Sequence, residues 1–325
     1  MSEAPSRWLR LVQQTPRTAW RLASWGLPRR ALLFGPLSLG DDLLCTAILR
    51  EARLRGKPWS MFTARPQLFA HNLDPTRIRP IDDYYVALLR SLGCQILSPY
   101  YLNRDPQNAD RDILPPRHII AEMCRLAGLS GVVQLRPWLF LTDEERSLGR
   151  RHPLQIAIHS SGAAAAIPYA NKEWGAAKFA AVARLLGSDF ELVQVGSAND
   201  PALPVKTDLR GKTSLRETAA IISGSLAFVG LEGFLMHLAR AVDCPSVVIF
   251  GGRARPEVFG YSANCNLVGT PPCSPCGLRN TCGYELKCMA EIAPEAAVEA
   301  VRRLAARPSG TLVVDTADLP SDVLS

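Results

Sequence analysis

The sequence predicts an α/β protein with two Rossmann-like domains that face each other across a cleft, each built on a parallel sheet. Three stretches support this prediction. Residues 226–252 contain two apolar, β-prone runs around a segment with apolar residues at helical spacing, which Pro245 ends. Residues 31–53 contain an apolar strand, a glycine-containing turn and a helix, and residues 154–196 start the same pattern again. Strands that are joined through helices pair in parallel, so each half predicts its own parallel sheet.

The length and composition agree with two globular domains. The chain has 325 residues, of which 47% are hydrophobic and 21% are charged. Domains of about 150 residues are common, so we expect two of them. The expected parts are an N-terminal arm, a first domain, a second domain and a tail, at residues 1–30, 31–148, 149–307 and 308–325.

The charge and the cysteines limit the class of protein. The net charge of +7 suits an anionic ligand, but no dense basic run or zinc-finger spacing indicates nucleic acid. No apolar run approaches the roughly 18–20 residues that span a bilayer, and the N-terminus lacks the apolar core of a signal peptide. Nine cysteines, an odd number, fit a reducing compartment. We therefore expect a cytoplasmic protein.

The first 30 residues predict a basic amphipathic arm. They contain six Arg against one acid, Glu3, and three Trp are interleaved among them. Pro16 divides the arm, which predicts two short helical pieces. A basic helix with Trp on its apolar face can lie on anionic lipid. The alternative is an arm that packs on its own protein with its Arg side chains in water.

A pair of acids follows the first predicted strand. Gly40 precedes Asp41 and Asp42 at the start of a helix that we expect over residues 41–53. Strand, glycine-containing turn and helix is the order of a phosphate-binding loop, but neither GxGxxG nor a Walker lysine is present. The acids are therefore either functional or simple caps of the helix.

A second carboxylate stands at a predicted strand end. Glu232 and Gly233 follow the first strand of the 226–252 unit, at the edge where open α/β sheets bind ligands. A carboxylate there can accept two hydrogen bonds from a ribose diol, and glycine lets a ligand approach the backbone. The alternative is a Glu that favours the positive end of the helix dipole.

Four cysteines form a candidate metal site. Cys273, Cys276, Cys282 and Cys288 have the spacing C-x2-C-x5-C-x5-C, and four thiolates can bind zinc or iron tetrahedrally. Such a metal would be structural, because no His or carboxylate accompanies the cluster. Disulfides and free thiols are the alternatives. The Asp-Arg-Asp triplet at 110–112 has the form of a metal-binding DxD, but we read it as part of a polar loop.

Six segments, in this order, resemble the lipopolysaccharide heptosyltransferases of glycosyltransferase family nine. They are GDDLL (40–44), K-x-W (172–174), VQVGS (193–197), LRGKTSLRE (209–217), LEGFLMHLARAV (231–242) and VVIFGG (247–252). The Cys-rich segment 272–289 is similar to that of one branch of the family. The resemblance covers about residues 31–305.

The resemblance implies a GT-B fold and an inverting transferase that needs no metal or other cofactor for catalysis. It implies ADP-heptose or a similar nucleotide sugar as donor, bound by the second domain. It also implies a lipopolysaccharide-type, lipid-linked glycan as acceptor, bound by the first domain. Together with the basic arm, this predicts a cytoplasmic protein that contacts the inner-membrane surface. The alternatives are a relative that glycosylates protein, or a nucleotide-sugar-binding scaffold without activity.

The resemblance also assigns roles to the residues that match the family's motifs. Asp41 matches the general base that deprotonates the acceptor hydroxyl, with Asp42 as the alternative. Lys172 matches the lysine that contacts the leaving diphosphate. The helix N-termini after Ser160-Ser161 and Glu232-Gly233 would assist it.

Three further residues are candidates for ligand contact. Glu232 stands where well-known members have Asp, and we expect it to bind donor hydroxyls. His237, one turn into the next helix, either contacts the ligand or is structural. Arg253 either reaches anionic groups of the acceptor or is a solvated loop arginine.

Overall fold

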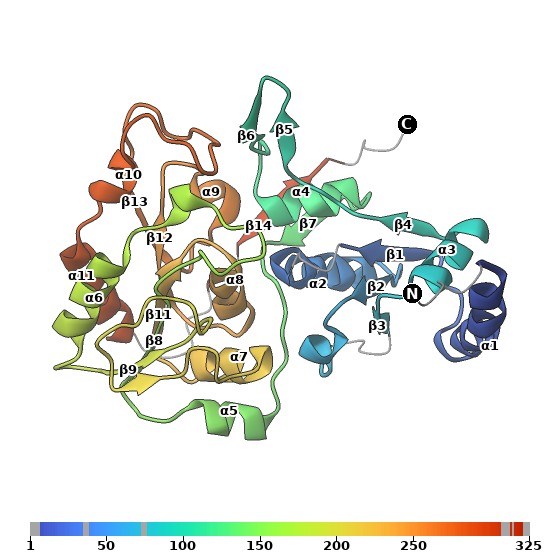
Figure 1. Ribbon diagram of the computed structural model, residues 1–325, viewed down its shortest axis with the longest axis horizontal. Coiled ribbons are helices and arrows are strands. Elements are labelled where there is room, and N and C mark those ends of the chain that lie inside the picture. Colours follow the sequence, from blue (N-terminus) through green and yellow to red (C-terminus); the bar gives the residue numbers. More distant parts are fainter. Residues whose placement is uncertain (1–6, 35–38, 73–76, 307–312, 314, 321–325) are drawn as a thin grey trace, which may run out of the picture.

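Two parallel sheets organise the molecule in the computed structural model, which describes residues 7–34, 39–72, 77–306, 313 and 315–320 (Figure 1). The first sheet has the order β3-β2-β1-β4 and the second has the order β10-β9-β8-β11-β12-β13. The strands of the first sheet are β1 (Arg30–Leu33), β2 (Ser60–Thr63), β3 (Ile78–Pro80) and β4 (Gln95–Leu97). Those of the second are β8 (Gln155–Ile158), β9 (Glu191–Gln194), β10 (Thr207–Asp208), β11 (Ala227–Leu231), β12 (Ser246–Phe250) and β13 (Cys265–Val268). The predicted α/β fold with parallel sheets is confirmed.

The strand order reverses at β1 in the first sheet and at β8 in the second sheet. β1 pairs in parallel with β2 on one side and β4 on the other, and β8 pairs likewise with β9 and β11. A point where the strand order reverses opens a crevice at the carboxyl ends of the strands, and ligands bind there in open α/β sheets. The segments after β1, β4, β8 and β11 are therefore where a site is expected. Residues 35–38 of the first turn lie outside the described residues.

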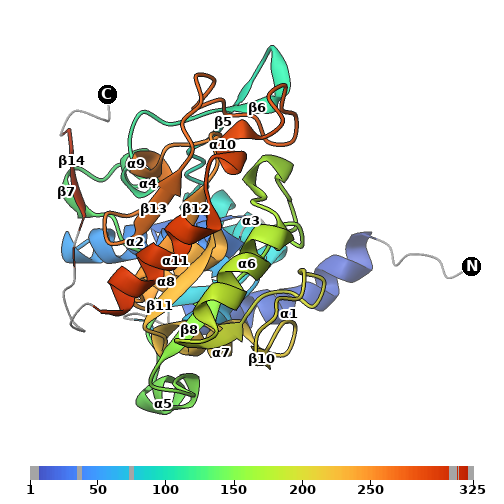
Figure 2. The same cartoon turned by 90° about the vertical axis from the view of Figure 1, so that its left-hand side faces the viewer.

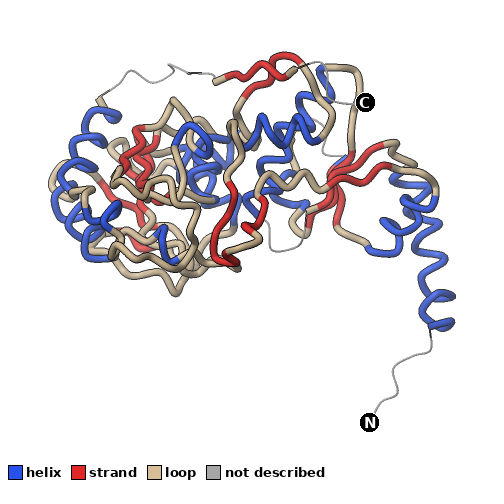
Figure 3. Tube along the Cα trace, turned by 90° about the horizontal axis from the view of Figure 1, so that it is seen from above, coloured by secondary structure: helices blue, strands red, loops and turns tan. Residues whose placement is uncertain are grey.

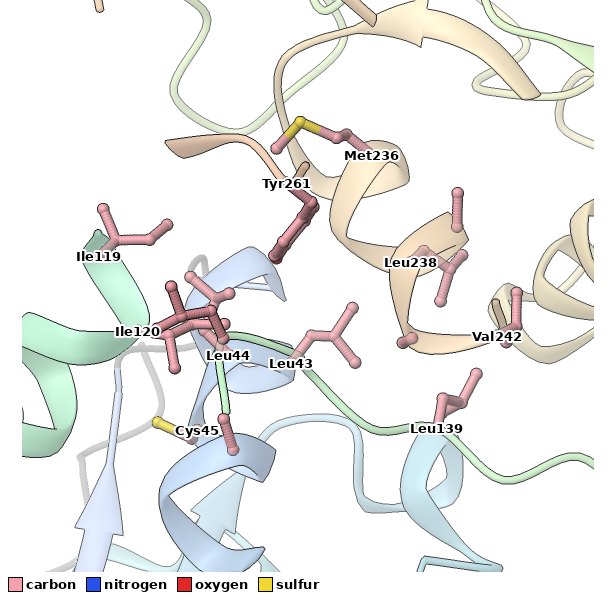
Figure 4. Packing of buried hydrophobic residues seen from close by; sticks show 14 of the residues in the cluster. Leu43, Leu44, Cys45, Ile119, Ile120, Leu139, Met236, Leu238, Val242 and Tyr261 are labelled. Atoms are coloured by element: carbon pink, nitrogen blue, oxygen red, sulfur yellow. The ribbon is translucent and has the colours of Figure 1, made fainter. Parts of the chain in front are cut away.

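The helices cover the sheets and join the two halves. α2 packs against α8 between the sheets, and one apolar cluster contains Leu43 and Leu44 of α2, Ile120 of α4 and Leu238 of α8 (Figure 4). The two halves thus share a buried core beside the expected crevice. The helices are α2 (Leu39–Leu54), α3 (Asp83–Ser91), α4 (Ile119–Leu126), α5 (Asp143–Gly149), α6 (Ala176–Leu186), α7 (Leu215–Ser223), α8 (Phe234–Ala241), α9 (Pro256–Phe259), α10 (Lys287–Ala290) and α11 (Pro294–Ala305), with 3-10 turns at η1 (Pro66–Phe69) and η3 (Ala170–Lys172).

Two stretches outside the expected strands and helices contain regular structure. Residues 143–152, whose mixed charges suggest a linker between the halves, contain α5, which Thr142 begins with a full capping box. Helix α5 packs on α7 so closely that a Cβ at Gly149 would lie 2.0 Å from the Ala220 carbonyl oxygen. In the predicted tail, β14 (Thr316–Leu319) pairs antiparallel with β7 (Gly131–Gln134) (Figure 2). Residues 308–312, 314 and 321–325 of the predicted tail lie outside the described residues.

The N-terminal arm is one helix, not the two predicted pieces. α1 (Arg7–Trp25) runs through Pro16 and projects from the first half beside α3 (Figure 3). Leu22 and Trp25 pack on a small apolar cluster, and Arg21 forms an ion pair with Asp82. The carboxyl-terminal part of the arm therefore packs on its own protein. No helix of the described residues is long and apolar enough to cross a membrane.

Polar residues 103–113 form a hairpin that periodicity does not reveal. β5 (Asn103–Asp105) and β6 (Asn108–Ile113) pair antiparallel and stand between the two halves (Figure 1). The 110–112 triplet, predicted to lie in a loop, is part of β6. Asp110 accepts hydrogen bonds from the backbone N–H groups of Asn280 and Thr281. The triplet therefore serves a contact within the chain.

Candidate functional site

Lys172 and Glu232 form an ion pair at the switch point of the second sheet. Lys172 ends η3, and Glu232 directly follows β11. Their Nζ and Oε2 atoms are 2.6 Å apart, and Glu232 is 8% exposed. Burial alone would raise the pKa of Glu232, but Lys172 and Arg253 outweigh it, so the pKa lies below its ordinary value. Burial lowers the pKa of Lys172 below its ordinary value, and the charge of Glu232 opposes this shift.

Arg253 adds a buried cation beside this pair. Its guanidinium is 1% exposed, donates through Nη2 to Asp112 and lies 4.8 Å from the ring centre of Tyr169. Its Nε and Nη1 atoms have no hydrogen-bond partner among the described residues. A buried donor that lacks a partner is costly, which makes these atoms ready to bind an anion. The alternative of a solvated loop arginine is wrong.

Asp41 approaches the second half through Tyr101. Tyr101 Oη donates to Asp41 Oδ1 at 2.9 Å, and the Tyr101 ring meets Phe259 edge-on at 6.1 Å. Burial raises the pKa of Tyr101 well above its ordinary value; Asp41 and Glu232 add to this, and Arg253 opposes it. Tyr101 is therefore within electrostatic reach of groups from both halves. The sequence analysis missed it, although it follows β4, the strand beside β1 at the first switch point.

Asp42 points away from these groups. It is completely buried and accepts a hydrogen bond from Thr63 at the end of β2. Its Oδ1 atom has no partner among the residues that the structure describes. Burial raises the pKa of Asp42 from 3.8 to about 7. Asp41 and Asp42 therefore differ in environment: Asp41 is half-buried beside Tyr101, and Asp42 is inside the domain.

The raised pKa of Asp42 makes the stability of the protein depend on pH. The folded state holds the Asp42 proton more tightly than the unfolded state, so this group's stabilisation is complete below about pH 4 and is lost as the pH rises towards 7. We expect Asp42→Asn to raise the melting temperature by roughly 5 °C at pH 8 and to change it much less at pH 5. Thermal unfolding at both pH values measures this. An equal shift at both would contradict it.

The remaining predicted residues hold the edge of the second sheet. The Ser160 hydroxyl donates to the Pro201 carbonyl at 2.8 Å, and the Ser161 hydroxyl donates to Glu173 at 2.9 Å, beside Lys172. Gly233 has φ 155°, which side-chain-bearing residues rarely adopt. His237 Nδ1 lies 2.6 Å from the Tyr261 hydroxyl, and burial lowers the pKa of His237 to about 3. This neutral, buried ring fits the structural interpretation of His237.

The structure does not support the predicted metal site at Cys273, Cys276, Cys282 and Cys288. In the described part of the chain, no three His, Cys, Asp or Glu side chains are arranged to hold a metal ion. The sulfur of the exposed Cys282 accepts the Leu286 N–H of its own loop. All four cysteines are free thiols in this structure.

The second half matches the model of a protein family. The model of glycosyltransferase family 9 (heptosyltransferase) matches residues 145–287. Residues 145–287 are a glycosyltransferase family 9 domain. This stretch contains Lys172, Glu232 and Arg253. No curated protein matches the sequence.

Solved structures of glycosyltransferases share the fold of almost the whole chain, and each match covers 85% of it. The family 9 glycosyltransferase of Veillonella parvula DSM 2008 has a TM-score of 0.59 and 14% identity over 97% of its length. The ADP-heptose LPS heptosyltransferase II of E. coli has a TM-score of 0.61 and 17% identity over 98% of its length. The iron-containing dodecameric glycosyltransferase TibC of enterotoxigenic E. coli H10407 has a TM-score of 0.63 and 17% identity over 75% of its length. At these identities the likeness is one of fold.

Proposed function

We propose that the protein is an inverting glycosyltransferase that moves heptose from ADP-heptose, or a similar nucleotide sugar, to a lipopolysaccharide-type glycan. The observation that carries the proposal is the place of Tyr101, which donates a hydrogen bond to Asp41 of the first half, packs against Phe259 of the second half and feels the charges of Glu232 and Arg253. A carboxylate from the first half and a cationic group from the second thus lie at one crevice. The family 9 domain supports the reaction class.

In the proposed reaction, the second half binds the donor and neutralises the leaving group. Lys172 and Arg253 contact the diphosphate, because both cations act on Glu232, Arg253 from a buried position and Lys172 from a partly buried one. Glu232 accepts hydrogen bonds from donor hydroxyls, and the open backbone at Gly233 leaves room for the sugar. Fixed positive charge in a dry site stabilises the charge that develops on the departing diphosphate.

The first half binds the acceptor and removes its proton. Asp41 acts as general base on the acceptor hydroxyl, which attacks the anomeric carbon while the nucleotide diphosphate leaves from the opposite face. The proton passes to Asp41, and a new glycosidic bond replaces the bond to phosphate with inversion. Tyr101 holds the Asp41 carboxylate through its hydrogen bond.

The test is ADP release from ADP-heptose, measured with lipid A–core glycan and with protein fractions as separate acceptors. We expect release that requires the glycan acceptor. We also expect EDTA to leave the rate unchanged, because Lys172 and Arg253 supply the positive charge that a metal would otherwise bring to the diphosphate. ADP release that occurs only with protein fractions would show that the acceptor is a protein rather than a glycan. A rate that EDTA abolishes and Mg²⁺ restores would contradict the role of the two cations.

We also propose a cytoplasmic protein that works at an anionic membrane surface through its N-terminal arm. Trp20 and Leu27 are 62% and 61% exposed, and six Arg stand in the first 30 residues. We expect co-sedimentation with phosphatidylglycerol vesicles that falls at high salt and weakens in Trp20→Ala. Equal binding to phosphatidylcholine vesicles, or none to either, would contradict this contact.

A further inference from the structure

The β5–β6 hairpin of the first half docks on the Cys-rich loop of the second. Asp112 N–H donates to the Gly277 carbonyl at 2.9 Å, and Gly277 N–H donates to the Arg253 carbonyl at 3.0 Å. Gly277 has φ 67°, and a Cβ there would lie 2.3 Å from the Asp112 carbonyl oxygen. One backbone path therefore runs from the hairpin, through a glycine that cannot be replaced without strain, to the residue that we assign to the donor diphosphate.

The side chains of Asp112 and Arg253 also connect the hairpin with the second half. The Asp112 carboxylate is 4% exposed and accepts from Nη2 of Arg253, whose guanidinium is 1% exposed. Arg279 is a weaker neighbour, with its Nε 3.9 Å from Asp112 Oδ1. Desolvated charges interact strongly, and removal of one partner leaves the other charge uncompensated. Asp112 is thus the carboxylate that fixes one edge of Arg253, while Nε and Nη1 keep no partner among the described residues.

A second carboxylate, Glu232, lies within electrostatic reach of Arg253. Glu232 feels the Arg253 charge and is already paired with Lys172 at 2.6 Å. Without Asp112, the nearest compensation for the buried guanidinium would be Glu232. Arg253 would then turn away from a bound diphosphate and occupy the carboxylate that we assign to donor hydroxyls.

We propose that Asp112 is a positioning residue that holds Arg253 ready for the donor diphosphate. Asp112 belongs to the first half and Arg253 to the second, so the donor site is complete only when the hairpin is docked. The inference rests on the proposed function, because it takes a nucleoside diphosphate as the ligand of Arg253. It assigns to the hairpin a role in donor binding that neither domain could fill alone.

The test is ADP binding measured by calorimetry on the full chain. We expect Asp112→Ala to weaken ADP binding about tenfold and Asp112→Asn, which keeps an acceptor oxygen in place, to weaken it less. Asp105→Ala is the matched control, because Asp105 lies in the same hairpin and pairs with the half-exposed Arg111 at 3.5 Å. In an Arg253→Gln background, Asp112→Ala should cause no further loss. Losses that multiply in the double variant, or wild-type affinity in Asp112→Ala, would overturn the proposal.

Hydrogen exchange without ligand tests the contact independently of the proposed function. We expect Asp112→Asn to speed up exchange in peptides that contain Cys276 and Gly277, whose N–H groups bond to the Gly252 and Arg253 carbonyls. Asp105→Ala should leave them unchanged. Faster exchange in a protein whose wild type binds no ADP would reject the nucleotide-sugar function while the Asp112–Arg253 contact stands. Unchanged exchange together with unchanged ADP affinity would reject the positioning role itself.

Discussion

Asp41→Asn is expected to lower the rate of transfer by at least about 100-fold while ADP still binds with wild-type affinity. A general base contributes roughly 10²–10⁴ to a rate, and Asn keeps the shape of Asp without its basicity. The amide oxygen of the substituted side chain can still accept the Tyr101 hydrogen bond that Asp41 accepts at 2.9 Å, so the crevice should keep its geometry. Steady-state kinetics and calorimetry on the same preparation separate the two effects.

Asp42→Asn is the matched control, because it makes the same change one residue along the chain. Asp42 is fully buried against Thr63, so we expect this variant to retain most of its transfer rate at neutral pH. The opposite result, a large loss in Asp42→Asn with a small one in Asp41→Asn, would assign the base to Asp42. Equally small losses of transfer rate in both variants would show that neither Asp41 nor Asp42 is the general base.

Lys172→Met should reduce kcat/KM for the donor by about 10²–10³, because it removes one of two cations that face the leaving diphosphate. The variant also leaves Glu232 without the partner that holds it at 2.6 Å. Loss of one member of a buried pair is destabilising, so we also expect a lower melting temperature. Donor kinetics and thermal unfolding measure the two consequences.

Lys206→Met provides the comparison for Lys172→Met. Lys206 pairs with Glu191 at 3.2 Å, but its side chain is 82% exposed. Surface ion pairs contribute little, so neither the kinetics nor the melting temperature should change appreciably. If Lys172→Met behaved like Lys206→Met, the diphosphate contact would have to be assigned elsewhere, with Arg253 the first candidate.

Segments with strong local signals were predicted well. The helix expected over residues 41–53 is α2 (Leu39–Leu54), and the two β-prone runs in residues 226–252 are β11 and β12, because apolar patterning is a local property. The β5–β6 hairpin and β14 were missed because their sequences are polar. Their partners, such as the Asn280 and Thr281 N–H groups that bind Asp110, lie far along the chain.

The sequence proposes residues for the candidate site but does not reveal their contacts. The sequence singled out Asp41, Lys172 and Glu232 through strand ends and motif order. It could not reveal that Lys172 pairs with Glu232. It also could not reveal that Arg253 is buried and forms an ion pair with Asp112 of the other half. The metal site lacks support in the described residues for a related reason: spacing identifies ligand types, whereas geometry depends on where the loop holds each thiol.

The configuration of the transferred sugar tests the central claim most directly. The protein would be incubated with a β-linked ADP-heptose and a lipopolysaccharide core acceptor, and the purified product would be analysed by NMR. Our account predicts one α-linked heptose for each ADP released, with far less product from Asp41→Asn in the same time. A β-linked product would contradict a single displacement with Asp41 as base. The absence of any glycan product from a folded protein that binds the donor would contradict the proposed transfer.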